Sequence, residues 1–152
     1  MYSLDTSGFL DGIKRYYPPD TFPGVWTRME GLVADRRVKA CEMVKAEIAK
    51  RDDDALAWME EHPDIVLPLD EERQRIVRDL LRNYPRLVDT RRGRSGADPF
   101  AISVAVKFNC PVITGEPRTG NMESPKIPDV CAAMGLEAIS FLELIKRERW
   151  VF

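Results

Sequence analysis

The chain has 152 residues, of which 44% are hydrophobic and 32% are charged. A chain of this length can bury about two-thirds of its unfolded surface, so we expect one domain over residues 1–152. The 23 basic and 25 acidic residues give a net charge of -2. This balance excludes a surface of general positive potential that would bind nucleic acids without specificity.

The sequence has no feature of a secreted or membrane protein. No apolar run reaches the length of a membrane span, and the N-terminus lacks the pattern of a signal peptide, so we expect a cytoplasmic protein that does not enter membranes. Cys41, Cys110 and Cys131 are widely spaced and odd in number, so we expect them to be reduced and mostly buried. The single histidine, His62, leaves carboxylates as the candidate catalytic groups, because a histidine pair is impossible.

Short apolar runs alternate with helical patterns along the chain. We expect strands at residues 1–4, 38–41, 111–114 and 137–140. We expect helices after residue 7, through Trp26 to Val33, around Val44 to Ile48, through Leu56 to Met59, from about Leu69 to Asn83, from Asp98 onward, and from Phe141 to Arg149. Residues 51–96 are expected to be helical apart from loops. This alternation predicts an α/β fold with a parallel sheet covered on both faces by helices.

An acidic residue ends the first strand. Asp5 follows the apolar run directly, and a helix begins at once, with Thr6 or Ser7 as the expected cap. Asp5 is therefore predicted to lie at the carboxyl end of the strand, where open α/β sheets bind ligands. Taken alone, Asp5 fits a capping role equally well.

Three further acidic residues occupy comparable positions. Asp98 stands where an N-cap belongs, before Pro99; Glu116 follows the strand at 111–114; and Glu47 lies on the helix after the second strand. Because the ends of parallel strands meet at one edge of a sheet, we expect these carboxylates to converge. Converging carboxylates repel one another, and a divalent cation such as Mg²⁺ or Mn²⁺ relieves that repulsion. Such a cation also activates water and neutralises charge on a phosphodiester, so the pattern favours a phosphodiester hydrolase.

These residues carry a resemblance to a known family. Residues 4–7, 42–48, 97–100 and 112–116 resemble the ordered acidic motifs of PIN domains, which include metal-dependent ribonucleases such as the VapC-type toxins of bacterial toxin–antitoxin pairs. The resemblance extends over essentially the whole chain, and the downstream segments 126–131 and 142–145 resemble a less characterised PIN-like branch.

The resemblance implies a fold, a cofactor and partners. It implies a three-layer α/β/α sandwich with a short-stranded parallel sheet, and a Mg²⁺ or Mn²⁺ site built from Asp5, Glu47 and Asp98, with Glu116 as the fourth acidic residue. It implies hydrolysis of RNA by the toxin of a toxin–antitoxin pair. An antitoxin protein and a second copy of the chain in a homodimer are the implied protein partners.

The chain departs from the family pattern at two positions. The fourth acidic residue of the family is usually aspartate, whereas here it is Glu116, whose longer side chain would reach a metal through water, and Asp129 is a second candidate in the outer shell. Glu42 competes with Glu47 for the second position. We prefer Glu47, because it lies on the helix face that is expected to pack inward.

A basic loop precedes the third acidic motif. Arg91, Arg92 and Arg94 are expected at the mouth of the acidic cleft, where they would bind RNA phosphates or an acidic antitoxin segment; a solvated linker is the alternative. A dimer surface is expected on the helices after residue 51 or near Trp150 and Phe152. The competing hypothesis for the whole protein is a PIN-like module that binds RNA or protein without catalysis.

Overall fold

The computed structural model describes residues 1–88 and 96–152 and contains one parallel sheet. The strands are β1 (Tyr2–Leu4), β2 (Val38–Cys41), β3 (Val66–Leu67), β4 (Val112–Ile113) and β5 (Ala138–Ile139). Their order is β3-β2-β1-β4-β5, and each neighbouring pair runs parallel. The four strands predicted from the sequence are therefore confirmed, and β1, which leads to Asp5, is the central strand.

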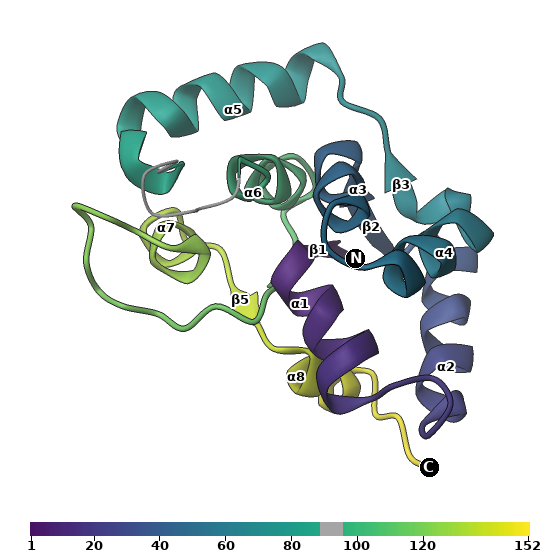
Figure 1. Cartoon of the computed structure of the whole chain (residues 1–152). Coiled ribbons are helices and arrows are strands. Elements are labelled where there is room, and N and C mark those ends of the chain that lie inside the picture. The colour runs from purple at the N-terminus through teal and green to yellow at the C-terminus, as the bar shows by residue number, and fades with distance from the viewer. Residues whose placement is uncertain (89–95) are drawn as a thin grey trace.

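Helices cover both faces of this sheet, so the fold is a three-layer α/β/α arrangement (Figure 1). The α-helices are α1 (Thr6–Leu10), α2 (Pro23–Ala34), α3 (Glu42–Ala49), α4 (Asp53–Glu61), α5 (Glu71–Asn83), α6 (Asp98–Phe108), α7 (Ile127–Ala133) and α8 (Phe141–Arg147). A π-helix, η1 (Asp11–Tyr16), continues α1, and two 3₁₀ turns are η2 (Pro63–Ile65) and η3 (Pro85–Leu87). Within the described ranges, no helix has both the length and the apolar character needed to cross a membrane.

The strand β3 corrects the expectation that residues 51–96 contain only helices and loops. It has two residues, Val66 and Leu67, which pair with Ala40 and Cys41 of β2. Both residues of β3 are only half-buried, because this strand lies at the edge of the sheet. Two residues are too few to show the alternation by which a strand is recognised in a sequence.

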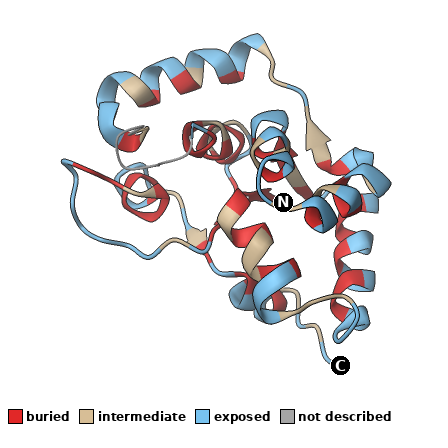
Figure 2. Cartoon of the chain, in the orientation of Figure 1, coloured by how far each residue is buried: buried red, intermediate tan, exposed pale blue. Residues whose placement is uncertain are grey.

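Buried residues gather where the helices face the sheet and one another (Figure 2). On one side, the rings of Phe9, Trp26 and Trp58 form an aromatic group, with 5.8 Å between the centroids of Phe9 and Trp26 and 5.1 Å between those of the two tryptophans. A second group joins α5, α6 and α7 to β4. The two tryptophans are thus core residues, and the three cysteines are free thiols buried in the structure, as expected.

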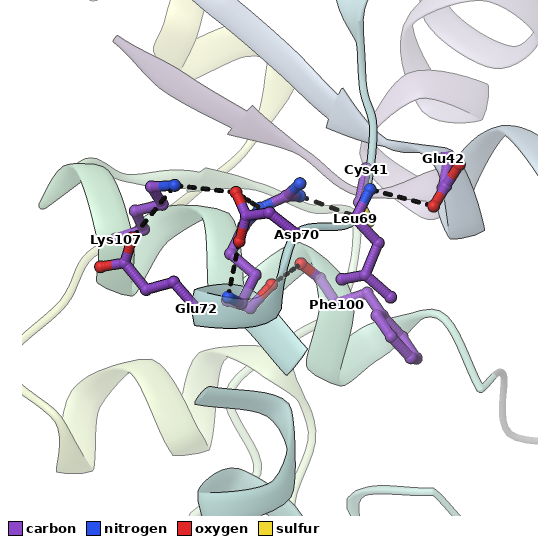
Figure 3. Close-up of polar contacts among 9 residues, drawn as sticks. Cys41, Glu42, Leu69, Asp70, Glu72, Phe100 and Lys107 are labelled. Carbon is purple, nitrogen blue, oxygen red and sulfur yellow. Dashed lines mark hydrogen bonds and ion pairs between the residues drawn. The ribbon is translucent and has the colours of Figure 1, made fainter. Parts of the chain in front are cut away.

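The carboxylates of Asp70 and Glu72 connect helix α5 to Lys107 of α6. Asp70 caps α5 by accepting a hydrogen bond from the Arg73 amide at 2.8 Å, and it also accepts one from Lys107 Nζ of α6 at 2.8 Å (Figure 3). The bond from Lys107 holds the pKa of Asp70 far below its usual range. Arg73 is completely buried, with Nη1 3.6 Å from Cys41 Sγ, and Nη2 has no hydrogen-bond partner among the described residues. These contacts fix the position of α6, which carries Asp98.

Helix α1 approaches β4 so closely that only glycine fits at the contact. A Cβ atom at Gly8 would overlap the carbonyl group of Ile113. We expect Gly8→Ala to lower the free energy of unfolding by roughly 1–3 kcal/mol, because the backbone of α1 must move away from the sheet. Gly31→Ala is the matched control: a Cβ there meets nothing within 4 Å, so this variant should gain about 0.5–1 kcal/mol of helix stability. Urea unfolding tests both, and equal effects would contradict the close approach.

Candidate acidic site at the strand ends

Asp5 links the end of β1 to the start of α1. It is the N-cap of α1, so the expectation that Thr6 or Ser7 caps this helix is wrong. Three donors bind one oxygen, Oδ2: Ser7 Oγ at 2.5 Å, Thr114 Oγ1 at 3.0 Å and the Ser7 amide at 3.2 Å. No described residue donates a hydrogen bond to the other oxygen, Oδ1. Asp5 can therefore cap α1 with Oδ2 and bind a cation with Oδ1 at the same time.

The surroundings of Asp5 disfavour its charge. The residue is 2% exposed, and burial raises its pKa to about 6. Hydrogen bonds from Ser7 and Thr114 lower the pKa, whereas the negative charges of Glu116 and Glu47 raise it further. Asp5 is thus a desolvated acid with acidic neighbours, which is the electrostatic situation that a cation would relieve.

Glu47 is the acid of α3 that lies beside the end of β1. Its Oε2 accepts a hydrogen bond from Thr6 Oγ1 at 2.7 Å, and its Oε1 lies 3.7 Å from the guanidinium of Arg51. Glu42, the alternative, faces another part of the protein, where its Oε1 accepts a hydrogen bond from the Leu69 amide at 2.9 Å (Figure 3). Of the two residues, the geometry therefore places Glu47 in the neighbourhood of Asp5.

Asp98 lies at the start of α6 and is 5% exposed. The N-cap of α6 is Ala97, so Asp98 is the first helical residue and not the cap that the sequence predicted. Helix α6 precedes β4, which is parallel to β1, and Ser3 Oγ of β1 donates a hydrogen bond to the carbonyl of Ala101 at 2.7 Å. Asp98 is one turn before Ala101, so it lies toward the carboxyl end of β1, where Asp5 also lies.

Glu116 follows β4 and reaches the same edge of the sheet. Its Oε2 accepts a hydrogen bond from the Ile127 amide at 3.0 Å, so one carboxylate oxygen is tied to the start of α7. A further acid, Asp11, also lies here and was not predicted from the sequence: a Cβ atom at Gly115 would overlap the carboxylate of Asp11. Asp11 begins the π-helix η1, and no helical period of 3.6 residues marks such a position in the sequence.

Asp129, the other candidate for the fourth acidic residue, has a different role. It accepts hydrogen bonds from the amides of Thr119, Gly120 and Lys126 at 2.7–2.9 Å, and from Thr119 Oγ1 at 2.6 Å. Burial alone would raise its pKa, but these bonds outweigh burial and hold the pKa at about 2. Through these hydrogen bonds, Asp129 connects the loop after Glu116 to the start of α7.

The four predicted site residues share one edge of the sheet but do not form a closed set of metal ligands. Among residues 1–88 and 96–152, no three histidine, cysteine, aspartate or glutamate side chains lie in an arrangement ready to hold a metal ion. The chemistry of the donors nevertheless fits Mg²⁺ or Mn²⁺, because they are all carboxylate oxygens and Oδ1 of the buried Asp5 accepts no hydrogen bond from a described residue. Arg91, Arg92 and Arg94 of the predicted basic loop lie outside the described residues.

The fold and the position of these acids define the class of the protein. It is a parallel α/β protein with an acidic candidate site at the carboxyl ends of its central strands. The sequence matches the family described as a domain of unknown function, DUF4411, over residues 2–152. Because the match spans nearly the whole chain, the protein belongs to this family. A comparison with curated proteins found no match. The resemblance to PIN domains stays a prediction.

The burial of Asp5 predicts a pH-dependent stability in metal-free buffer. The pKa of the Asp5 carboxyl is 3.8 in the unfolded chain and about 6 in the folded protein. The free energy of unfolding therefore falls as the pH rises from about 4 to 6, and it stays lowered above pH 6. Asp5→Asn removes this loss of stability and should raise the free energy of unfolding by about 3 kcal/mol more at pH 8 than at pH 4. Asp129→Asn should instead destabilise the protein at pH 8. Urea unfolding with EDTA measures both, and a gain for Asp5→Asn that is independent of pH would contradict the electrostatic account.

Proposed function

We propose that this protein is a metal-dependent endoribonuclease of the PIN type, which hydrolyses phosphodiester bonds in RNA. The observation that carries the proposal is the desolvated carboxyl of Asp5, whose pKa is raised by burial and by the nearby charges of Glu116 and Glu47. An acid in such surroundings is stabilised as an anion when a divalent cation binds. A buried acid that only capped α1 would not need acidic neighbours.

The residues of the chain divide into those that would hold the cation and those that orient them. Asp5, Glu47 and Asp98 would hold Mg²⁺ or Mn²⁺, and Glu116 would act as the fourth acid. The hydroxyls of Ser7 and Thr114 orient Asp5, and that of Thr6 orients Glu47, through hydrogen bonds of 2.5–3.0 Å. The bound cation would supply neutralisation of the charge that develops on the phosphodiester, together with activation of the attacking water. A catalytic histidine is not required.

The lack of three converging ligands in the described residues favours a second candidate function. In this alternative, the protein is a PIN-like module that binds RNA or another protein but no metal. Mn²⁺ titration calorimetry separates the two functions: the nuclease binds Mn²⁺ and loses that binding in Asp5→Asn, whereas the binding module gives no heat in either form.

The resemblance to VapC-type toxins supports a biological setting for the nuclease. We propose that it acts in the cytoplasm as the toxin of a toxin–antitoxin pair, inhibited by an antitoxin protein that covers the carboxylates, and that it is a homodimer. The side chains of Val151 and Phe152 are 83% and 68% exposed. They follow Trp150, in the region where a dimer surface is expected from the sequence. Apolar side chains exposed in this way are suited to contact with a second chain.

The nuclease proposal predicts RNA cleavage that depends on Mg²⁺ or Mn²⁺ and stops in EDTA. Asp5→Asn and Asp98→Asn should abolish it, and Ser7→Ala should lower kcat/KM by roughly 10–100-fold, because Ser7 only orients a ligand. Asp35→Asn, an exposed aspartate in the turn after α2, is the matched control and should cleave normally. Release of a quenched fluorophore from single-stranded RNA measures the rate. Cleavage by purified protein at full rate in EDTA would rule out the proposed mechanism.

The basic loop predicts how RNA binding depends on salt. Arg91, Arg92 and Arg94 would neutralise phosphates, so replacing all three with serine should weaken RNA binding and flatten its salt dependence by a slope of up to about 3. Mn²⁺ affinity should not change, because arginine does not bind the cation. Fluorescence anisotropy across a salt series makes the measurement. An unchanged slope would show that the loop is a solvated linker.

A further inference from the structure

A pocket of about 530 Å³ opens beside Glu116 and shares Thr114 and Gly115 with the acidic site. Its walls come from η1, from the segment after β4, from α7, and from β5 with the start of α8. The size suits one planar heterocycle with its sugar. Because the pocket continues from the proposed site of phosphodiester cleavage, a nucleotide next to the scissile phosphate can place its base there.

Two side chains of the π-helix η1 line the same pocket. Asp11 and Tyr16 are five residues apart, and they share a face of η1 because its turns are closed by bonds between residues five apart, such as that from the Tyr17 amide to the Gly12 carbonyl at 2.9 Å. In an α-helix of 3.6 residues per turn, the two side chains would point in different directions. The π-helix thus pairs a carboxylate with an aromatic ring.

The ring of Tyr16 is available for stacking. The residue is 51% exposed, and the guanidinium of Arg15 lies 5.1 Å from the ring centroid on one face. The ring of Tyr17 lies at a tilt beside it, with 6.4 Å between the centroids, and the exposed part of the Tyr16 ring borders the pocket. Single-stranded RNA is commonly recognised in this way, by stacking of unpaired bases on aromatic side chains together with hydrogen bonds to their edges.

Four acids line the pocket, and three of them already have close partners; one of these is Glu116, which accepts a hydrogen bond from the Ile127 amide at 3.0 Å. Glu137 is held by the guanidinium of Arg147, and Glu143 accepts a hydrogen bond from the Ser140 amide at 2.8 Å. Among the described residues, Asp11 has only a loose ion pair, in which its Oδ1 lies 3.7 Å from Arg15 Nη1, so it is the acid of this pocket best able to accept hydrogen bonds from a ligand. The lining contains four carboxylates and one arginine, Arg118, so acidic groups outnumber basic ones, which disfavours a phosphate group and favours a ligand that presents N–H donors.

We propose that this pocket binds a guanine base of the RNA, stacked on Tyr16 and hydrogen-bonded to the carboxylate of Asp11. The position next to the scissile phosphate rests on the proposed ribonuclease function, whereas base binding does not. Guanine presents two adjacent donors, N1–H and the N2 amino group, which match the two oxygens of a carboxylate. Uracil presents a single N–H between two carbonyl oxygens, which a carboxylate repels. The site therefore selects guanine over uracil.

The test is titration of the full chain with nucleosides, followed by the amide NMR signals of residues 114–118. EDTA in the buffer and the absence of a phosphate group make the result independent of metal and of catalysis. Guanosine should bind at least tenfold more tightly than uridine, and inosine, which lacks the N2 amino group, should bind several-fold more weakly than guanosine. Equal affinity for guanosine and uridine, or no shift at these residues with guanosine, would overturn the proposal.

Variants assign the roles of the two side chains. Tyr16→Ala should lose guanosine binding and Tyr16→Phe should keep it, because the ring and not the hydroxyl stacks on the base. Asp11→Asn should abolish the preference for guanosine, whereas the matched control Asp35→Asn should keep it. Loss of binding in Tyr16→Phe, with an unchanged unfolding midpoint, would overturn the stacking role. Guanosine binding without RNA cleavage would support the base site and contradict the ribonuclease function. RNA cleavage without guanosine binding would support the ribonuclease function and contradict the base site.

Discussion

The arrangement of the whole site depends on the desolvation of one carboxylate at the end of the central strand. Asp5 is 2% exposed, and the charges nearest to it include those of Glu116 and Glu47, so its ionised form is disfavoured in the metal-free protein. The hydroxyls of Ser7 and Thr114 offset part of this cost by donating hydrogen bonds to Oδ2. A divalent cation bound to Oδ1 would offset the remaining cost of ionising Asp5. The same residue therefore affects both the stability of the fold and the proposed chemistry.

Close backbone contacts bring the separate segments of the site together. Gly8 lets α1 lie against the end of β4, and Gly115 leaves room for the carboxylate of Asp11. These two contacts join the first twelve residues to the segment after β4, which is about one hundred residues away in sequence. The π-helix η1 then carries Tyr16 to the neighbouring pocket. One continuous edge of the protein thus contains both the acidic site and the pocket.

Much of this arrangement could be predicted, because a strand that stops at an acid and turns into a helix is a local pattern. That pattern located β1 and Asp5, and parallel strands then implied that Glu116 lies at the same edge. The contributions of η1 and β3 could not be predicted, since a π-turn has no signal in a 3.6-residue period and a two-residue strand has no alternation. The helix-face pattern favoured Glu47 over Glu42, but the partners of the two side chains, Thr6 and Leu69, are tertiary contacts that a local pattern does not encode.

The most direct test of the account is anomalous diffraction from crystals of the protein soaked in Mn²⁺ near pH 7.5. We expect one strong manganese peak within about 2.0–2.3 Å of Oδ1 of Asp5, with carboxylate oxygens of Glu47 and Asp98 completing its protein ligands. The side chains would have to rotate on binding, because no three acids of the described residues are arranged around one ion. A fully soaked crystal with no peak at Asp5, or with manganese bound elsewhere on the surface, would contradict this expectation.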